Sequence, residues 1–400
     1  MNVPDGPLRI LFASPAWWPA VAFGGPIWIG RELTERLAGR GHEVQVLTTT
    51  LVDLDRPGAT RSRDDVVAGV KVRYLATPLR YRWMGISPGL PVELRRLERP
   101  DVVHVFGFRD VITTGVATWA RASRIPYVFE PLGMFRPRLR KVRFKRVFDA
   151  TVARGVTAGA AAVVVSSSVE RDDVLGSGLS GERIRVRGCG FPEPFESARK
   201  GRLRRELGIS ADAPVILYVG RIAAGKGIEL LLDAARDLPE AHLVLAGPDD
   251  RHGTIDRVRA AQADAATRSR VHVFQPGERP LWIYSEADVL ALPSTGESFG
   301  MVASEAAAAG TPVVLSDRCG VADFFEEGEA VVVPYDGPAL TDALRRVLGD
   351  AALRRRLSDG GREAARRTSW DRIADRQEQL YREALAASRT AATRFSTLGS

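Results

Sequence analysis

Short apolar runs alternate with helix-length segments along the whole chain, and this alternation limits the folds that the chain can adopt. Strands that alternate with helices form parallel sheets covered by helices, because each crossover between parallel strands needs about a dozen residues. The pattern pauses at 190–200, GFPEPFESARK, and then restarts. We therefore predict an α/β protein with two Rossmann-like, doubly wound domains that face a cleft. The expected strands are 8–13, 43–49, 70–74, 102–106, 127–129, 161–165, 215–219, 242–246, 271–274, 289–292, 313–316 and 330–333.

The pause predicts domains at 1–195 and 196–369, followed by a tail at 370–400. A length of 400 residues agrees with two domains, since a single core rarely grows beyond about 250–300 residues. Apolar residues recur at helical spacing between Trp370 and Leu385. We expect a helix over 370–387 and a frayed end after residue 388.

Cysteine content and hydropathy predict a reduced, cytoplasmic setting. Cys189 and Cys319 are too few for a disulfide framework, and neither lies in a metal-like cluster. No apolar run approaches the roughly 18 residues of a membrane span, and the N-terminus lacks the basic start of a signal peptide. Any contact with a membrane is therefore expected to be peripheral, at its inner face.

The chain is basic, with 57 Lys and Arg against 49 Asp and Glu and a net charge of +8. Residues 136–146, RPRLRKVRFKR, hold seven of these cations in eleven positions. A basic amphipathic helix there would suit an anionic membrane surface or a charged acceptor, and a solvated charged face is the alternative. Nucleic acid is not expected as a partner, because neither a nucleic-acid motif nor interleaved aromatic residues accompany the charge.

Two glycine-containing loops stand where a strand passes into a helix. The first holds Gly24 and Gly25 before a proline, so its backbone amides suit an anion, although a turn that needs glycine explains it equally well. The second is 218–229, YVGRIAAGKGIE, which matches most of a phosphate-binding P-loop. Gly227 stands where an ATPase needs Ser or Thr for magnesium. Arg221 and Lys226 still supply charge, so we predict a phosphate site without ATPase activity.

Residues 293–314, PSTGESFGMVASEAAAAGTPVV, predict a strand end, a turn and a short helix that stops at Gly310. Between Phe299 and Ser316 the only ionisable side chain is Glu305. A carboxylate in such an alanine-rich helix is costly to bury without hydrogen-bond donors. It must therefore reach solvent or receive donors, and we expect a ligand to supply them.

Taken in order, these motifs resemble the retaining glycosyltransferases of family four, which have the GT-B fold. The most specific element is ESFGMVASE, in which Glu297 and Glu305 stand eight residues apart. The GGP loop, the YVGR…GKG loop and the W…I…Y pattern of the tail support the resemblance, which covers most of the chain.

The resemblance implies that 196–369 binds a nucleoside-diphosphate sugar and that 1–195 is the acceptor side, with the tail helix crossing back to it. Glu305 would bind the ribose hydroxyls and Glu297 the transferred sugar. Arg221 and Lys226 would neutralise the diphosphate, so neither a metal nor a cofactor is expected. The implied catalytic residues are Glu297, Arg221 and Lys226. The implied donor-binding residues are Gly24, Gly25, Arg221, Lys226, Glu297, Ser298, Phe299, Gly300, Met301 and Glu305.

Three residues are candidates for the acceptor side. Trp17 follows the first strand, where it either stacks on a sugar or covers the core. His104 lies in the buried run DVVHVF as a structural or a catalytic histidine. Glu130 stands two residues before Leu132, the position at which relatives often carry a histidine, so no catalytic histidine is carried over.

The implied reaction transfers a glycosyl group, with retention, from a nucleotide-sugar to a hydroxyl of a glycan, a lipid-linked acceptor or a small molecule. A nucleotide-sugar epimerase of similar architecture is one alternative, although it would lack the two-glutamate element. A nucleotide-sugar-binding subunit without catalysis is the other, and Leu132 keeps it open.

Overall fold

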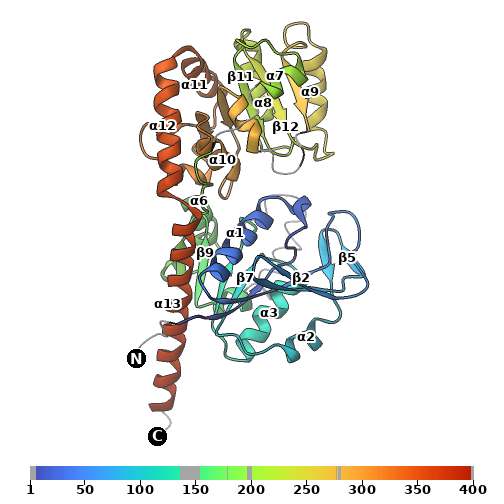
Figure 1. Ribbon diagram of the computed structural model, residues 1–400, viewed down its shortest axis with the longest axis vertical. Coiled ribbons are helices and arrows are strands. Elements are labelled where there is room, and N and C mark those ends of the chain that lie inside the picture. The colour runs from blue at the N-terminus through green and yellow to red at the C-terminus, as the bar shows by residue number, and fades with distance from the viewer. Residues whose placement is uncertain are drawn as a thin grey trace. The chain divides into compact units, whose positions relative to one another are not determined.

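The computed structural model describes residues 6–135, 154–177, 179–195, 201–275, 277 and 281–397, with side chains described up to residue 388. The chain divides into two compact units (Figure 1). Unit 1 comprises Met1–Ser166, Glu170–Arg187 and Asp371–Ser400, and unit 2 comprises Ser167–Val169 and Gly188–Trp370. The chain therefore passes between the units at Ser166–Ser167, Val169–Glu170, Arg187–Gly188 and Trp370–Asp371.

Unit 1 contains an eight-stranded sheet in the order β10-β9-β8-β7-β1-β2-β4-β3. Every neighbouring pair is parallel except β3 and β4. A short antiparallel hairpin, β5 and β6, stands apart from the sheet. The strands are β1 (Arg9–Ala13), β2 (Glu43–Thr49), β3 (Arg63–Val67), β4 (Val70–Leu75), β5 (Leu79–Tyr81), β6 (Met84–Ile86), β7 (Val102–Phe106), β8 (Tyr127–Glu130), β9 (Ala162–Val165) and β10 (Ile184–Val186).

Helices cover both faces of this sheet. Because successive side chains of a strand point to opposite faces, Val103 and Val105 of β7 join the core cluster under α2, α3 and α5, whereas His104 faces the other side. On that side lie α1 and α13 (Figure 1). The helices are η1 (Val21–Phe23), α1 (Gly25–Gly39), α2 (Leu90–Arg96), α3 (Val111–Ala122), α5 (Arg154–Gly159), α6 (Ser168–Leu175), η3 (Gly181–Arg183) and α13 (Trp370–Thr397).

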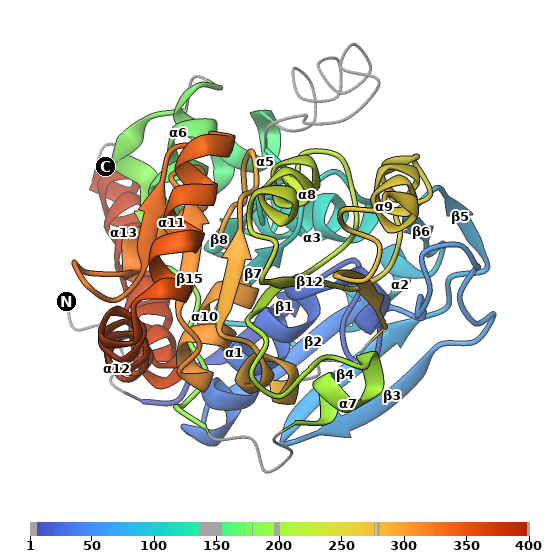
Figure 2. The ribbon, with the colours of Figure 1, turned by 90° about the horizontal axis from the view of Figure 1, so that it is seen from above.

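Unit 2 contains a six-stranded, all-parallel sheet in the order β13-β12-β11-β14-β15-β16. Helices α8, α9 and α11 pack together over it, while α10 packs with α12 and η4 (Figure 2). The strands are β11 (Val215–Val219), β12 (His242–Ala246), β13 (Val271–Phe274), β14 (Val289–Leu292), β15 (Val313–Ser316) and β16 (Val331–Val333). The helices are α7 (Arg202–Leu207), α8 (Ile228–Asp237), α9 (Thr254–Ala263), η4 (Leu281–Glu286), α10 (Met301–Ala309), η5 (Gly320–Phe324), α11 (Gly337–Gly349) and α12 (Ala351–Arg367).

The predicted α/β class with parallel sheets is confirmed, and every expected strand is present within a residue or two of its predicted bounds. Four strands were not predicted. Strand β3 (RDDVV) is polar and lies at the sheet edge, and β5, β6 and β10 have only three residues each. Helix α13 continues to Thr397, ten residues beyond the predicted end at residue 387. The frayed end after residue 388 stays a prediction.

The described part of the chain has no helix that is both long enough and apolar enough to cross a bilayer. The basic run 136–146 lies outside the described residues, so its proposed contact with an anionic membrane surface stays a prediction.

The segments of unit 2 that follow Arg187 and precede Asp371 lie side by side. The Phe191 amide donates to the Thr368 carbonyl over 2.8 Å, and Trp370 packs against Gly190. A Cβ added at Gly190 would lie 2.4 Å from the Trp370 ring. Glycine is therefore needed at this position for close approach rather than for backbone freedom.

We expect Gly190→Ala to destabilise the protein by about 1–3 kcal/mol or more, because overpacking forces Trp370 out of its position. Gly349→Ala is the matched control. A Cβ at Gly349 meets nothing within 4 Å, and alanine is the better helix former by about 1 kcal/mol. Thermal unfolding of the two variants checks this. Equal melting temperatures for the two variants would contradict the expectation.

Candidate functional site

The predicted donor residues other than Gly24 and Gly25, which belong to unit 1, gather at one end of the sheet in unit 2. Strand β11 pairs with β12 on one side and with β14 on the other, so the order of the strands reverses between β11 and β14. Ligands of open α/β sheets bind at the carboxyl ends of the strands beside such a reversal. The loop after β11 carries Arg221 and Lys226, and the loop after β14 carries Glu297.

Close backbone contact joins these two loops. The amide and hydroxyl of Thr295 donate to the Gly225 carbonyl over 2.9 and 3.0 Å. At Gly227 the φ angle is 71°, and an added Cβ would lie 1.9 Å from the Pro293 carbonyl oxygen. Only glycine fits here. This explains why the residue that an ATPase would use for magnesium is absent from an otherwise P-loop-like sequence.

Lys226 and Glu297 form an ion pair at this edge, in which the Lys226 ammonium donates to Oε1 of Glu297. Both side chains keep access to solvent, with exposed fractions of 23% and 21%. The Ser294 hydroxyl also donates to this Oε1 over 3.2 Å. Backbone hydrogen bonds to Arg318 and Gly320 hold residue 297 in place. A cation and an anion are thus held together where a ligand can reach both.

Arg221 is exposed, and its backbone carbonyl accepts a hydrogen bond of 2.8 Å from the Tyr218 hydroxyl. Burial raises the pKa of Tyr218, and the neighbouring Glu297 raises it further. Burial likewise raises the pKa of the nearby Cys319 thiol to about 11. Both groups therefore stay protonated at neutral pH and hold loops rather than react.

In the turn before α10, backbone groups rather than side chains are available to a ligand. The Phe299 ring is 3% exposed and packs in the core against Phe324, while the Ser298 carbonyl accepts from the Ser167 hydroxyl over 2.6 Å. Gly300 is the N-cap of α10, with φ of 111° and no side-chain cap. Helix N-termini bind anions through their amides, so Met301 begins a helix that suits a diphosphate.

Glu305 is 8% exposed within α10. Sequence reasoning assigned its hydrogen-bond donors to a ligand, but the structure supplies a protein donor: the Tyr284 hydroxyl donates to Oε2 over 2.6 Å. The expectation that only a ligand supplies donors to Glu305 is therefore corrected, since Tyr284 supplies one. Tyr284 lies in η4, 21 residues earlier in the chain, and nothing in the sequence pattern links the two positions.

In unit 1 the GGP loop begins α1, with Gly24 as N-cap at φ of 80° and Gly25 as the first helical residue. No side chain caps this helix either. Trp17 is only 1% exposed, so of its two interpretations the structure agrees with the core. The neighbouring Trp18 packs instead against Trp28, with Arg31 over its ring.

His104 and Glu130 do lie together, but in a buried polar network. Nε2 of His104 lies 3.1 Å from Oε2 of Glu130, and Nδ1 lies 2.7 Å from the Tyr381 hydroxyl. The Arg187 guanidinium binds both Glu130 oxygens over 2.7 Å and donates to Gln377 over 2.7 Å. His104 and Arg187 are fully buried and Glu130 is 1% exposed.

The network explains these residues as structural. Burial lowers the pKa of His104. Burial alone would raise the pKa of Glu130, but Arg187 and His104 outweigh it and hold that pKa below its usual range. Tyr381 and Gln377 belong to α13, so the network fastens that helix to β7 and β8. The catalytic interpretation of His104 and Glu130 on the acceptor side therefore has no support in this geometry.

Two loops at the carboxyl ends of β7 and β8 hold non-glycine residues in the left-handed region, Arg109 at φ of 60° and Leu132 at φ of 55°. The Arg109 guanidinium donates to the Met134 and Phe135 carbonyls and so joins the loops. Such conformations are costly and concentrate at functional sites. These loops are a candidate acceptor region that sequence reasoning reached only through Leu132.

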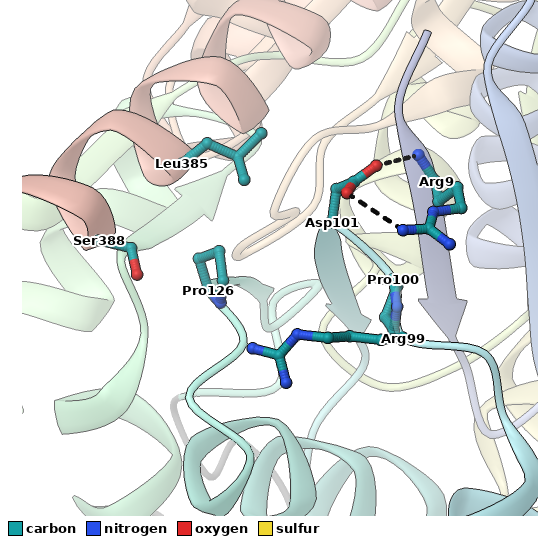
Figure 3. Close-up of a pocket in the computed structure, with 7 residues that line it drawn as sticks. All are labelled: Arg9, Arg99, Pro100, Asp101, Pro126, Leu385 and Ser388. Atoms are coloured by element: carbon teal, nitrogen blue, oxygen red, sulfur yellow. Dashed lines mark hydrogen bonds and ion pairs between the residues drawn. The ribbon is translucent and has the colours of Figure 1, made fainter. Parts of the chain in front are cut away.

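A separate cavity of about 300 Å³ lies at the amino ends of β1 and β7, under α13 (Figure 3). Asp101 there accepts from the Arg9 amide over 2.7 Å, and Arg99 donates to the Ser123 and Arg124 carbonyls. The Arg9–Asp101 contact joins the amino ends of β1 and β7, and Arg99 holds the turn after α3. None of the predicted site residues lines this cavity. Among the described residues, no group of three or more His, Cys, Asp or Glu is arranged to hold a metal.

Family models match both halves of the chain. Residues 199–364 match "Glycosyl transferases group 1", and residues 24–190 match "Glycosyl transferase 4-like domain". The chain is 32% identical to a D-inositol 3-phosphate glycosyltransferase of Xylanimonas cellulosilytica, over 88% of this chain and 90% of that protein. It is 28% identical to a protein of the same name from Jonesia denitrificans, over 89% and 91%.

Solved structures agree in fold. A sucrose-phosphate synthase from Thermosynechococcus elongatus superposes with a TM-score of 0.73 at 26% identity, over 94% of this chain and 99% of that one. HepE of Anabaena in complex with UDP superposes with a TM-score of 0.74 at 17% identity, over 93% and 99%.

The buried network predicts how unit 1 responds to pH. The folded chain keeps His104 neutral, because its pKa is lowered, whereas the unfolded chain protonates it below about pH 6.5. The unfolded state then binds more protons, so the free energy of unfolding falls as the pH is lowered. We expect His104→Gln to lessen this fall by up to about 1.4 kcal/mol per pH unit.

Urea unfolding at pH 7, 6 and 5 measures this difference in slope. Gln at the exposed position His252 is the control and should leave the slope of the native protein unchanged. A His104→Gln slope equal to that of the native protein would contradict the assignment of a neutral, buried histidine.

Proposed function

Because the chain belongs to the glycosyl transferases of group 1 and is a glycosyltransferase that takes its sugar from a nucleotide-sugar, we propose that unit 2 holds this donor at the carboxyl edge of its sheet. The observation that carries the proposal is the meeting of Lys226, Glu297 and the uncapped N-terminus of α10 beside the reversal of strand order. Cationic charge, helix amides and an acceptor oxygen are the groups that a sugar diphosphate requires.

Lys226 stabilises the departing diphosphate. An ammonium has three N–H donors, so its bond to Glu297 leaves donors for phosphate oxygens. Arg221 adds an exposed cation after the same strand. Because negative charge on the leaving group grows in the transition state, these cations and the amides of Gly300 and Met301 favour the transition state over the ground state.

Glu297 and Glu305 address different ends of the donor. Glu297 lies in the turn before α10, whereas Glu305 lies one turn inside that helix, about 6 Å along the helix axis from Met301. This separation suits an extended nucleotide-sugar. Glu305 accepts from the ribose hydroxyls, and Glu297 contacts the transferred sugar while it holds Lys226. We propose transfer with retention at the anomeric carbon and without a metal, because protein cations supply the charge that a metal would. If no metal takes part, we expect activity to persist in the presence of EDTA.

The acceptor is a hydroxyl compound that unit 1 binds. Two relatives that span most of the chain are named for D-inositol 3-phosphate, so this is the first acceptor to test. The backbone-strained loops at Arg109 and Leu132 are the region we propose for it. The proposal that the protein binds an anionic membrane surface rests only on the basic sequence of residues 136–146.

The test of function is product formation with UDP-, GDP- and ADP-sugars in turn, with D-inositol 3-phosphate present and absent. Thermal shift against the same donors identifies the base, since a ligand that binds the folded state raises its stability by mass action. A new glycoside supports the proposal. Release of a free epimer, or magnesium-dependent ATP hydrolysis without any response to nucleotide-sugars, would overturn it.

Two variants separate the roles of the site residues. We expect Glu305→Ala to weaken donor binding at least tenfold, because it leaves the ribose hydroxyls without an acceptor. We expect Lys226→Ala to lower kcat more than affinity, since its charge matters most in the transition state. Glu363→Ala, at a side chain that is 61% exposed on α12, is the control. Unchanged turnover and donor affinity in both site variants would refute the site assignment.

A further inference from the structure

Glu305 is held by a buried phenol. The Tyr284 side chain, 2% exposed, extends from η4 and donates its hydroxyl to Oε2 of Glu305 over 2.6 Å. A buried carboxyl oxygen without a donor costs the full desolvation penalty of that group. This bond therefore restricts the rotation of the carboxylate as well as lowering the cost of burying it.

Tyr284 is itself fixed from the far end of α10. The Thr311 hydroxyl donates to the Tyr284 carbonyl over 2.6 Å, and the Thr311 amide donates to the Ala306 carbonyl of α10 over 2.9 Å. The Ala287 amide donates to the same Tyr284 carbonyl over 3.2 Å. Thr311 thus ties the backbone of η4 to that of α10, which holds the residue that carries the phenol in place beside the helix that carries Glu305.

Recognition of two neighbouring ribose hydroxyls depends on the orientation of the carboxylate. A side chain that must be ordered when the ligand binds loses part of the binding free energy to that ordering. Glutamate has three side-chain torsions, so a glutamate without a fixed partner would lose more than one already oriented.

We propose that Tyr284 is a positioning residue for the donor site: its hydroxyl pre-orients the Glu305 carboxylate for the ribose hydroxyls of the nucleotide-sugar. The inference rests on the proposed function of Glu305. It deepens that function by adding a residue that does not touch the donor and acts through Glu305.

The test is Tyr284→Phe, which keeps the ring and removes only the hydroxyl. Calorimetric titration is done with UDP, GDP and ADP, each in its ribose form and its 2′,3′-dideoxyribose form. For the base that the native protein binds, we expect about a tenfold loss of affinity for the ribose form and no loss for the dideoxyribose form. With a nucleotide-sugar donor, KM should rise by a similar factor while kcat changes less than twofold.

Tyr127→Phe is the matched control, since it removes a buried phenol hydroxyl that donates to the Val156 carbonyl in unit 1. It should destabilise the protein without altering nucleotide affinity. Glu305→Gln is the second reference, and the double variant Tyr284→Phe/Glu305→Gln should bind the ribose form no more weakly than Glu305→Gln alone. This comparison remains available if Tyr284→Phe by itself fails to fold.

The outcomes separate the inference from the function on which it rests. Native affinity in Tyr284→Phe together with a loss in Glu305→Gln overturns the role of Tyr284 and leaves the donor site standing. An equal loss for ribose and dideoxyribose forms also overturns it, because the hydroxyl would then act on the whole site. Native affinity in Glu305→Gln overturns the ribose role of Glu305, and the inference with it.

Discussion

The approach of the Gly227 backbone to the Pro293 carbonyl is the contact on which the site in unit 2 depends. The two loops that follow β11 and β14 come from strands about 70 residues apart in the chain, and they meet only because residue 227 has no side chain. This contact sets where Lys226 stands relative to Glu297. The backbone therefore fixes the positions of the Lys226 and Glu297 charges before any ligand binds. Electrostatic catalysis requires charges that are placed in advance in this way.

The parts of the site that were predicted from the sequence are those that local pattern determines. The apolar runs predicted β11 and β14, and the glycines marked the turns after them, while the common site of Lys226 and Glu297 was implied by the family resemblance. Tyr284 was not predicted, because its contact with Glu305 depends on how η4 packs on α10. No periodicity or spacing in WIYSEADVLAL indicates that packing.

On the acceptor side, the sequence left His104 open as a structural or a catalytic histidine, and burial favours the structural interpretation. His104 and Glu130 are enclosed by Arg187, Tyr381 and Gln377. Arginine is almost never fully buried unless it is paired, so a buried Arg187 had no sequence signal. Removing one member of such a network leaves a charge without a partner, which costs far more than the intact network contributes to stability.

The fastening of α13 by Tyr381 and Gln377 also bears on how the chain folds as it is made. Unit 2 is nearly continuous in sequence and has all its strands once residue 333 has been synthesised. Unit 1 begins first, and its charged residues Glu130 and Arg187 can already pair once residue 187 has been made, but Tyr381 and Gln377, which bind His104 and Arg187, leave the ribosome last. Domains generally fold as units and in order of synthesis. Here the second unit in the sequence is the first that can be completed, and a nascent unit 1 must wait for the two neutral residues, Tyr381 and Gln377, that complete its buried polar network.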